Sequence, residues 1–278
     1  MTITAKIPYI DWDTGFIRYW NGGNPAVTHA FNALSFLFPQ GEKYFIDIAK
    51  EVALKISFRI NGDLQIAVRQ FIAQESIHRN QHEKYNGVLK SQGYENTVSK
   101  TIDRLNLQSR RYFSPLTNLA IVCGYEHFTA ILGNFILNNP QVLKPASPNM
   151  ALIWGWHSAE ETEHKAVCFD LYHAAGGGWV RRVIMYILVT INFNLLFGRL
   201  YFSLLKHDRQ FTLSKLIPTV YTIFDFFFGW SGVAWHLIWY GLKYLSPFFH
   251  PWNQNNRSKL EAWLETNQSH LRALPGHH

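Results

Sequence analysis

Two stretches decide the fold of this chain: residues 71–78 read FIAQESIH, and residues 156–164 read WHSAEETEH. Each contains a Glu-x-x-His pair, Glu75 with His78 and Glu161 with His164, within apolar spacing that is typical of a helix. Positions i and i+3 share one face of a helix. The chain therefore predicts two helices, far apart in sequence, that each direct a carboxylate and an imidazole the same way.

Two further helical segments each carry one candidate inward carboxylate, Glu42 and Glu126. A four-helix bundle that offers Glu, Glu-x-x-His, Glu and Glu-x-x-His has the ligand set of a carboxylate-bridged dimetal site. At roughly 1.5 Å per residue, Glu126 lies about 18 Å before the end of its helix and Glu161 about 18 Å after the start of the next. For Glu42 and Glu75, the corresponding distances along their two helices agree less closely. We predict an all-α, ferritin-like four-helix bundle with additional C-terminal apolar helices.

A third histidine extends the ligand set. His157 precedes Glu161 by four residues, and it lies within about 60° of the same helix face. The alternative for His157 is a core histidine or one that hydrogen-bonds a ligand. Buried carboxylates are costly unless they are paired or bound to metal. The predicted metal ligands are Glu42, Glu75, His78, Glu126, His157, Glu161 and His164.

Three neighbours of these ligands are predicted to play other roles. His82 lies one turn beyond His78, and we expect it to hydrogen-bond a ligand. Glu160 is expected at the rim of the site, also beside the ligands. Glu163 is expected to face solvent.

Glycine, proline and polar segments divide the N-terminal part of the chain. An irregular arm of about 25 residues comes first. The predicted helices run from about 26 to 58 with an interruption near Pro39, from about 63 to 93, from about 115 to 137 and from about 147 to 176. Residues 94–114 are polar and basic, and we interpret them as a connection.

The triple glycine 176–178 is the best internal boundary, because glycine favours the backbone conformation that ends a helix. It separates an N-terminal part, residues 1–178, which contains the predicted bundle, from an aromatic, basic part, residues 179–278. The second part predicts two long apolar helices, from about 179 to 207 and from about 213 to 245.

The chain of 278 residues has a formal charge of +7, and the charge is uneven. Residues 179–252 hold seven Lys/Arg against Asp208 and Asp225, together with many aromatics. Long apolar runs separate the basic residues, which favours an anionic membrane surface over nucleic acid. Residues 183–198 and 226–242 are uncharged for 16 and 17 residues. A spanning helix needs roughly 18–20, so we expect buried or interfacial helices instead.

The cysteines and the N-terminus indicate the compartment. Cys123 and Cys168 are the only cysteines, they form no CxxC motif, and we expect both to be small core residues. The first residues lack the apolar stretch of a signal peptide. We therefore expect a cytoplasmic protein that lies on the inner face of the cell membrane if its apolar helices bind lipid.

At these motifs the chain resembles a bacterial family, the predicted metal-dependent hydrolases of ferritin-like type. The resemblance rests on residues 38–42 (FPQGE), on residues 71–78 with His82, on residues 156–166 (WHSAEETEHKA) and on residues 249–252 (FHPW). It spans roughly residues 20–265, which is nearly the whole chain. The resemblance implies a metal site on a helical fold.

More distantly, the chain is similar to the diiron arylamine N-oxygenases, which combine Glu, Glu-x-x-His, Glu and His-x-x-x-Glu-x-x-His. Here that pattern matches Glu42, Glu75 with His78, Glu126, and His157 with Glu161 and His164. The likeness covers only the predicted bundle. Nothing in the C-terminal third supports an arylamine substrate.

Four carboxylates and three imidazoles form a hard site that suits iron or manganese. We expect two iron ions, with a manganese-containing site as the alternative. The first hypothesis is a diiron enzyme that activates dioxygen to oxidise or oxygenate an apolar substrate, and such an enzyme needs an electron donor. The second is a two-metal hydrolase, although the sequence shows no obvious extra general acid. The third is a metal-binding protein without catalytic activity.

Two kinds of role stay open for the C-terminal part, one in substrate access and one in packing. Its helices could form an apolar tunnel, or lie on a membrane and admit a lipid-like molecule. They could equally be a packed layer or the interface of a homodimer.

Overall fold

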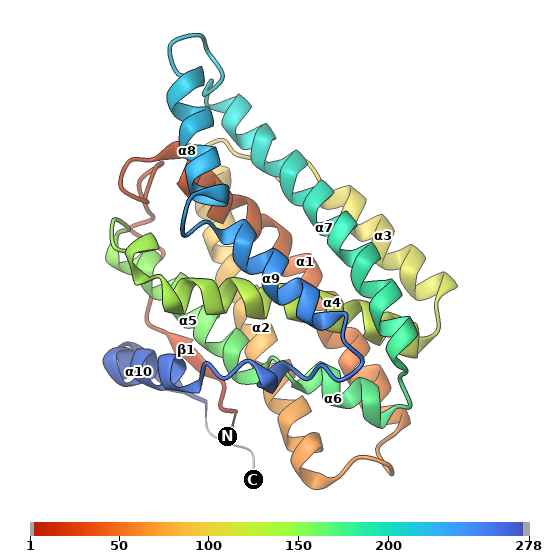
Figure 1. The fold of residues 1–278 in the computed structure, drawn as a ribbon. Coiled ribbons are helices and arrows are strands. Elements are labelled where there is room, and N and C mark those ends of the chain that lie inside the picture. The colour runs from red at the N-terminus through yellow and green to blue at the C-terminus, as the bar shows by residue number, and fades with distance from the viewer. Residues whose placement is uncertain (1–2, 275–278) are drawn as a thin grey trace.

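The computed structural model describes residues 3–274, and their regular secondary structure is almost entirely helical (Figure 1). The predicted all-α fold is confirmed. The helices are α1 Pro25–Lys55, α2 Gly62–Ser91, α3 Ser99–Tyr112, α4 Pro115–Asn138, α5 Pro148–His164, α6 Val167–Ala174, α7 Trp179–His207, α8 Leu216–Phe228, α9 Val233–Tyr244 and α10 Arg257–Asn267. Short 3-10 turns occupy Pro140–Val142, Pro251–Asn253 and Gln268–His270. Strands β1 (Lys6–Pro8) and β2 (Leu271–Ala273) pair antiparallel and join the two ends of the chain.

The helix starts follow from local chemistry. Asn24 caps α1, Asn61 caps α2 and Ser114 caps α4, and each side-chain oxygen accepts a backbone N–H of the first turn. Proline occupies the first position of α1, α4 and α5, where its missing N–H costs nothing. These signals fix where each helix begins, and hence which residues face inward.

The predicted interruption at Pro39 is wrong, because α1 continues through this residue. Proline cannot donate to the carbonyl four residues earlier. Here the Asn86 side chain supplies the missing donor, with its Nδ2 2.9 Å from the Ser35 carbonyl oxygen. A contact between α1 and α2 therefore compensates for a local helix breaker.

Three other boundaries differ from the prediction. Part of the expected connection forms α3, an amphipathic helix whose Ile102 packs inward. The fourth predicted helix is divided at Lys165, where the buried Nζ donates to the Gln254 carbonyl and to Asn256 Oδ1. The last apolar helix is divided into α8 and α9 by a turn at Gly232, which is so tight that a Cβ there would clash with the Phe227 carbonyl oxygen.

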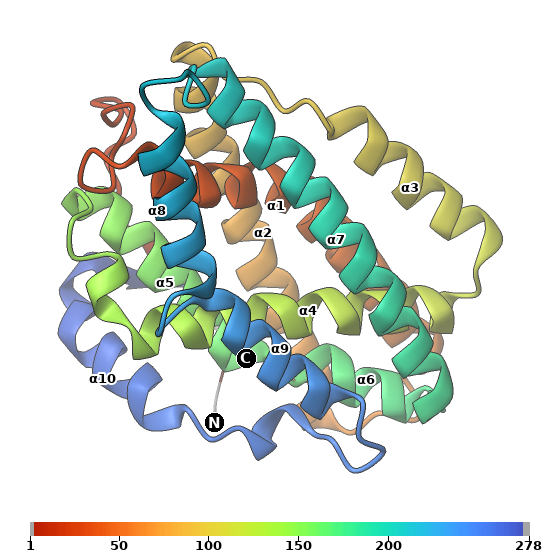
Figure 2. The same cartoon turned by 45° about the horizontal axis from the view of Figure 1, so that its top comes forward.

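The two predicted parts of the chain pack on a common core. Helix α7 lies across α1 and α4, and α9 covers α4 (Figure 2). Leu200 and Leu204 of α7 belong to the same apolar cluster as Phe31 and Leu34 of α1. The boundary at residue 178 and the regular four-helix bundle both stay predictions.

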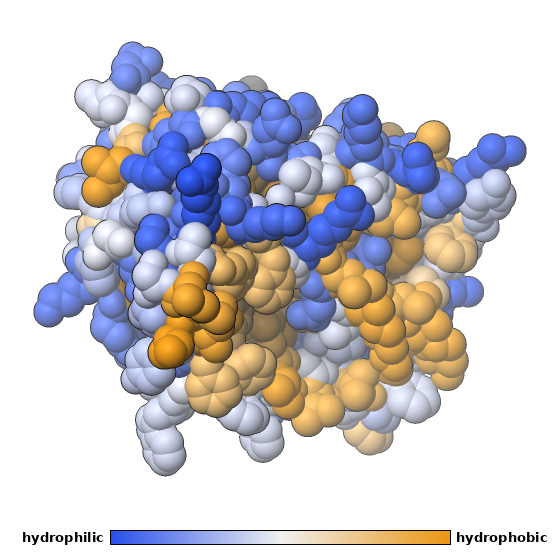
Figure 3. Space-filling view, turned by 90° about the horizontal axis from the view of Figure 1, so that it is seen from above, coloured by the Kyte–Doolittle hydropathy of each residue, from blue (hydrophilic) through white to orange (hydrophobic). Residues whose placement is uncertain are grey.

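Helices α7, α8 and α9 expose apolar residues on their outer sides. Figure 3 shows such side chains gathered along one side of the molecule, while much of the remaining surface in this view is hydrophilic. Three segments are long and apolar enough to cross a membrane by length and composition alone: α4, α7, and residues 216–244 taken together. Helix α4 is largely buried inside the protein, whereas only a minority of the residues in the other two segments are buried.

Candidate metal centre

Four helices direct the predicted ligands to one place in the interior. The residues come from α1 (Glu42), α2 (Glu75 and His78), α4 (Glu126) and α5 (His157, Glu161 and His164). All of them are buried. The structure thus brings together every residue that the sequence predicted as a metal ligand.

One half of the centre surrounds His164. Its Nε2 lies 3.3 Å from Glu75 Oε1, 3.4 Å from Glu126 Oε2 and 3.4 Å from Glu161 Oε2. These side chains come from α2, α4 and α5, so three helices converge on a single imidazole nitrogen.

The other half surrounds His78. Ligand atoms of Glu42, His78 and His157 all lie within 4.8 Å of one another. His78 Nδ1 also lies 3.4 Å from Glu75 Oε1 and 3.7 Å from Glu161 Oε1. Glu75 and Glu161 therefore lie between the two halves, where bridging carboxylates of a dimetal site are expected.

The ligand atoms fit a metal because the protein itself does not satisfy most of them. Buried polar atoms normally have hydrogen-bond partners. Among the described residues, no hydrogen-bond partner is found for most of the ligand atoms at the centre, although His157 Nε2 and Glu161 Oε1 pair with each other. The atoms without a partner are both carboxylate oxygens of Glu42, Glu75 and Glu126, Oε2 of Glu161, Nδ1 of His78 and Nε2 of His164.

The hydrogen bonds behind His164 leave a lone pair for a metal. Gln74 Nε2 donates to Glu163 Oε2 over 2.7 Å, which turns Gln74 Oε1 toward His164 Nδ1, 2.9 Å away. Nδ1 of His164 therefore donates to Gln74 Oε1, and Nε2 is the nitrogen that faces the centre. His78 is held likewise, since its Nε2 lies 3.1 Å from Glu160 Oε2.

A longer chain orients His157. The Ser35 hydroxyl donates to Asn86 Oδ1 over 2.8 Å, so it accepts from His82 Nδ1, 2.9 Å away. His82 Nε2 then accepts from His157 Nδ1 over 2.8 Å. His157 Nε2 is thereby turned toward the centre, 3.0 Å from Glu161 Oε1. The arrangement favours His157 as a ligand, with His82 as its hydrogen-bonding neighbour.

The N-terminal arm reaches the centre from outside, which the sequence did not reveal. The backbone N–H of Lys6 donates to Glu160 Oε1 over 2.8 Å, and Lys6 Nζ pairs with Glu163 Oε1 at 2.9 Å. Both acids are buried, so the expectations of a solvent-facing Glu163 and a rim position for Glu160 are wrong. Neither Lys6 nor Gln74 was predicted, since only long-range packing brings them to the site.

The electrostatics of the centre call for positive charge. Burial, together with the nearby Glu75 carboxylate, raises the pKa of Glu42 well above its ordinary value. Burial and the same neighbour raise the pKa of Glu126 similarly. Glu161 differs: although burial opposes it, His164 and His157 hold its pKa well below the usual range. Cations at the centre would remove the repulsion among these acids.

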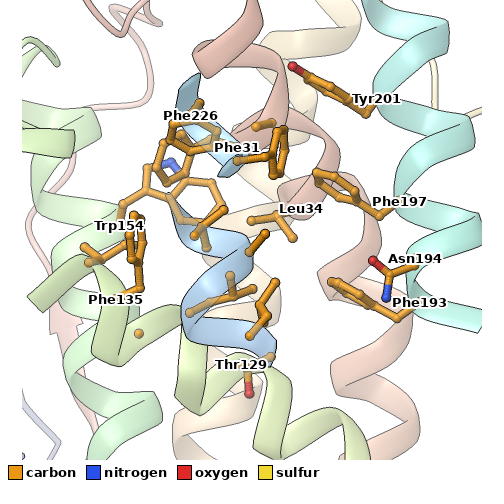
Figure 4. A pocket seen from close by; sticks show the side chains of 18 of the residues that line it. Phe31, Leu34, Thr129, Phe135, Trp154, Phe193, Asn194, Phe197, Tyr201 and Phe226 are labelled. Atoms are coloured by element: carbon orange, nitrogen blue, oxygen red, sulfur yellow. The ribbon is translucent and has the colours of Figure 1, made fainter. Parts of the chain in front are cut away.

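An apolar cavity of about 320 Å³ leads to the centre. It lies between α1, α4, α5 and helices α7–α9, and Phe31, Phe197 and Phe226 point into it (Figure 4). At its inner end the lining includes His157 and Glu161. The lining also includes Phe202 and Phe228, which are exposed on the surface.

The fold and this centre define a helical protein with a buried carboxylate–histidine site that suits metal ions. The chain belongs to the family described as predicted metal-dependent hydrolases, whose family model matches residues 4–255. This confirms the resemblance seen in the sequence. No curated protein matches the chain, and no solved structure does. The likeness to diiron arylamine N-oxygenases is not confirmed, and the family description favours the hydrolase hypothesis over the oxygenase hypothesis.

Proposed function

We propose that this protein is a two-metal-dependent hydrolase that acts on an apolar substrate. The observation that carries the proposal is the group of unsatisfied carboxylate and imidazole atoms at the inner end of an apolar cavity. The family description supports hydrolysis as the reaction.

The ligands divide between two metal positions. Glu126 and His164 would hold one ion, and Glu42, His78 and His157 the other, with Glu75 and Glu161 reaching both. Two bound ions would supply Lewis-acid activation of water and of the scissile bond, and ions that cycle between oxidation states would alternatively supply dioxygen activation. Four carboxylates balance the charge of two divalent ions.

The residues around the ligands hold them in place. Glu160, Gln74 and His82 each fix the proton of one ligand imidazole on the nitrogen that faces away from the centre. The Phe38 ring stacks on His157, with the ring centroids 4.7 Å apart, and closes that side of the centre. Such support keeps the ligand atoms preorganised.

The cavity indicates the substrate class. Its wall is mainly aromatic and aliphatic, and its volume lies near the lower end of the usual range for ligand pockets, about 300–1,000 Å³. The hydroxyls of Thr129 and Ser158 donate to backbone carbonyls at 3.1 and 2.6 Å, so neither is paired with a side chain that could act as its general base. A slender apolar chain with its polar, cleavable group at the inner end fits this space.

A second candidate is the dioxygen-dependent oxidation of the same kind of substrate by two iron ions. The donor set favours it, because oxygen and imidazole nitrogen ligands without a thiolate suit iron and manganese. An electron donor would then be a further partner.

The experiment compares both reactions on one metal-loaded sample. Hydrolysis of medium-chain acyl esters and amides is measured without oxygen, and oxygen consumption is measured with matching hydrocarbons and a chemical reductant. We expect metal-dependent hydrolysis that Glu126→Gln abolishes and Glu95→Gln, a change at an exposed acid, leaves intact. Oxygen consumption without hydrolysis would favour the second candidate, and neither activity in a metal-loaded sample would contradict both.

A further inference from the structure

Helices α8 and α9 each present a continuous apolar stripe to solvent. On α9 the stripe consists of Trp235, Ile238, Trp239 and Leu242, which follow the i, i+3, i+4, i+7 spacing of one helix face. All four are exposed although they are large and apolar. An apolar surface of this kind marks an interaction site.

Helix α8 repeats the pattern. Its exposed residues Ile217, Val220, Tyr221 and Phe224 follow the same spacing, while Phe226 and Phe227 face the cavity. The helix is therefore apolar on both sides, although only one side is covered by protein. A helix that is apolar all round is normally buried in a core or in a membrane.

Basic side chains stand at both ends of this surface. Lys206, Arg209 and Lys215 lie around the connection from α7 to α8, and all three are exposed. Arg181 and Lys243 lie at the opposite end, where Trp179 Nε1 donates to the Leu245 carbonyl over 2.9 Å and joins the start of α7 to the end of α9.

Acidic side chains are almost absent from the same region. Within residues 179–245, all of which the structure describes, Asp225 is the only exposed acid, and Asp208 is buried in hydrogen bonds to His29 and Tyr94. Two copies of this surface placed against each other would bring basic ends together with little acid to neutralise them. A flat anionic surface with an apolar interior complements both the charge and the apolar stripes.

We propose that the outer faces of α8 and α9, with the outward side of α7, dock on an anionic phospholipid bilayer. The helices lie in the plane of the interface, with Trp235 and Trp239 at the depth of the headgroups, which is the region that tryptophan prefers. The inner side of α7 packs on the protein core through Leu200, Leu204 and Leu205, so it does not face lipid.

Docking places the opening of the cavity at the bilayer. Phe202 and Phe228 line the cavity and are exposed beside the apolar stripes. An acyl chain can then pass from the membrane toward His157 and Glu161 without crossing water. This route, unlike the docking itself, rests on the proposed function.

The test is flotation of the full chain with vesicles of phosphatidylcholine alone or of an equal mixture with phosphatidylglycerol. We expect binding to the mixed vesicles that weakens as salt is added. Equal binding to both kinds of vesicle, or binding to neither, would overturn the proposal. The measurement involves neither metal nor turnover, so failure of the proposed chemistry would leave its result unchanged.

Two variants separate the apolar stripes from a general loss of folding. Ile217→Glu with Ile238→Glu, at positions 80% and 50% exposed, should lower binding at least tenfold. The matched control is Leu54→Glu with Ile66→Glu, at positions 67% and 46% exposed on α1 and α2, and it should bind like the wild type. An equal loss in both would contradict docking through α8 and α9.

A second pair of variants tests how much the basic side chains contribute to membrane binding. Lys215→Ala with Lys243→Ala should weaken binding at low salt by about fivefold for each charge removed. Lys84→Ala with Lys90→Ala removes two exposed charges from α2 and should change nothing. Sedimentation tests whether the surface binds a second copy of the chain instead. The proposal is refuted if the wild type is a dimer that does not bind vesicles and if Ile217→Glu with Ile238→Glu makes it monomeric.

Discussion

The interior where α1, α2, α4 and α5 meet and the outer side of α7–α9 reverse the usual distribution of polarity. The first region buries six carboxylates and several imidazoles, whereas the second exposes tryptophan, phenylalanine and isoleucine. A buried acid and an exposed apolar patch are each informative because each costs stability without a partner. The comparison shows that each region leaves a need unmet within the described residues, and we propose metal ions as the partner of the first and a lipid surface as the partner of the second.

Removal of a ligand should have the largest effect. Glu126→Gln keeps the shape of the side chain but removes one of the charges that a metal requires. We expect the rise in melting temperature on metal addition, about 4 kcal/mol of stabilisation at a thousandfold excess over Kd, to disappear in this variant. Calorimetry with and without metal measures it, and Glu95→Gln on the surface should keep the full rise. If the melting temperature of Glu126→Gln still rises on metal addition, the metal does not bind through Glu126 and the proposed site is wrong.

Obstruction of the cavity should affect substrate and spare the metal. Gly198 lines the cavity in the middle of α7, and a Cβ added there meets nothing within 4 Å. Gly198→Leu should therefore fold well and fill the cavity, and we expect kcat/KM for long acyl substrates to fall about 100-fold, a cost of about 2.7 kcal/mol. Metal content should be unchanged. Gly87→Leu, at an open position of α2 away from the cavity, is the control.

Loss of a supporting hydrogen bond should have a smaller effect on the centre. Glu160 accepts from both His78 Nε2 and the Lys6 backbone N–H, each on its own oxygen. In Glu160→Gln one oxygen remains to accept, so one of the two bonds is lost. We expect metal affinity to fall about 10–100-fold, measured by competition with a chelator. An affinity equal to that of the wild type would mean that Glu160 does not position His78.

The smallest effect concerns the junction between the two regions, where Asp208 ties the end of α7 to the core. Its carboxylate accepts from Tyr94 at 2.5 Å and pairs with His29 at 2.8 Å. Although burial opposes it, these partners hold the pKa of Asp208 below its usual range. Because the pKa of Asp208 is lowered in the folded protein, its carboxylate stabilises the fold at pH values above the ordinary pKa of aspartate. This contribution to stability is lost as the pH falls through the lowered pKa.

Asp208→Asn should therefore destabilise the fold by about 2 kcal/mol at neutral pH, and the difference should shrink below about pH 4. Chemical denaturation across pH measures both. Asp225→Asn, at the exposed acid of α8, should change stability by less than about 0.5 kcal/mol. A deficit in Asp208→Asn that grows toward acid would contradict this sign.

The sequence predicted most of the centre because its signals are local. The spacing of Glu75 with His78 and of Glu161 with His164 places each pair on one helix face. The cap residues define the helix ends, and the position of each ligand along its helix axis is measured from those ends. Pairings distant in sequence carried no such signal. Lys6 pairs with Glu163, which is 157 residues away in sequence. Asn86 donates to the Ser35 carbonyl, 51 residues away, which Pro39 leaves without a donor. The buried Glu163 and the continuous α1 were therefore both missed.

The most direct test of the account is the number and place of metal ions in the full chain, measured by elemental analysis and by anomalous scattering from a crystal. We predict two ions per chain, one beside Glu126 and His164 and one beside Glu42, His78 and His157, with Glu75 and Glu161 between them. A metal-supplemented protein that holds no ion at these residues, or holds as much metal after Glu126→Gln as before, would contradict it.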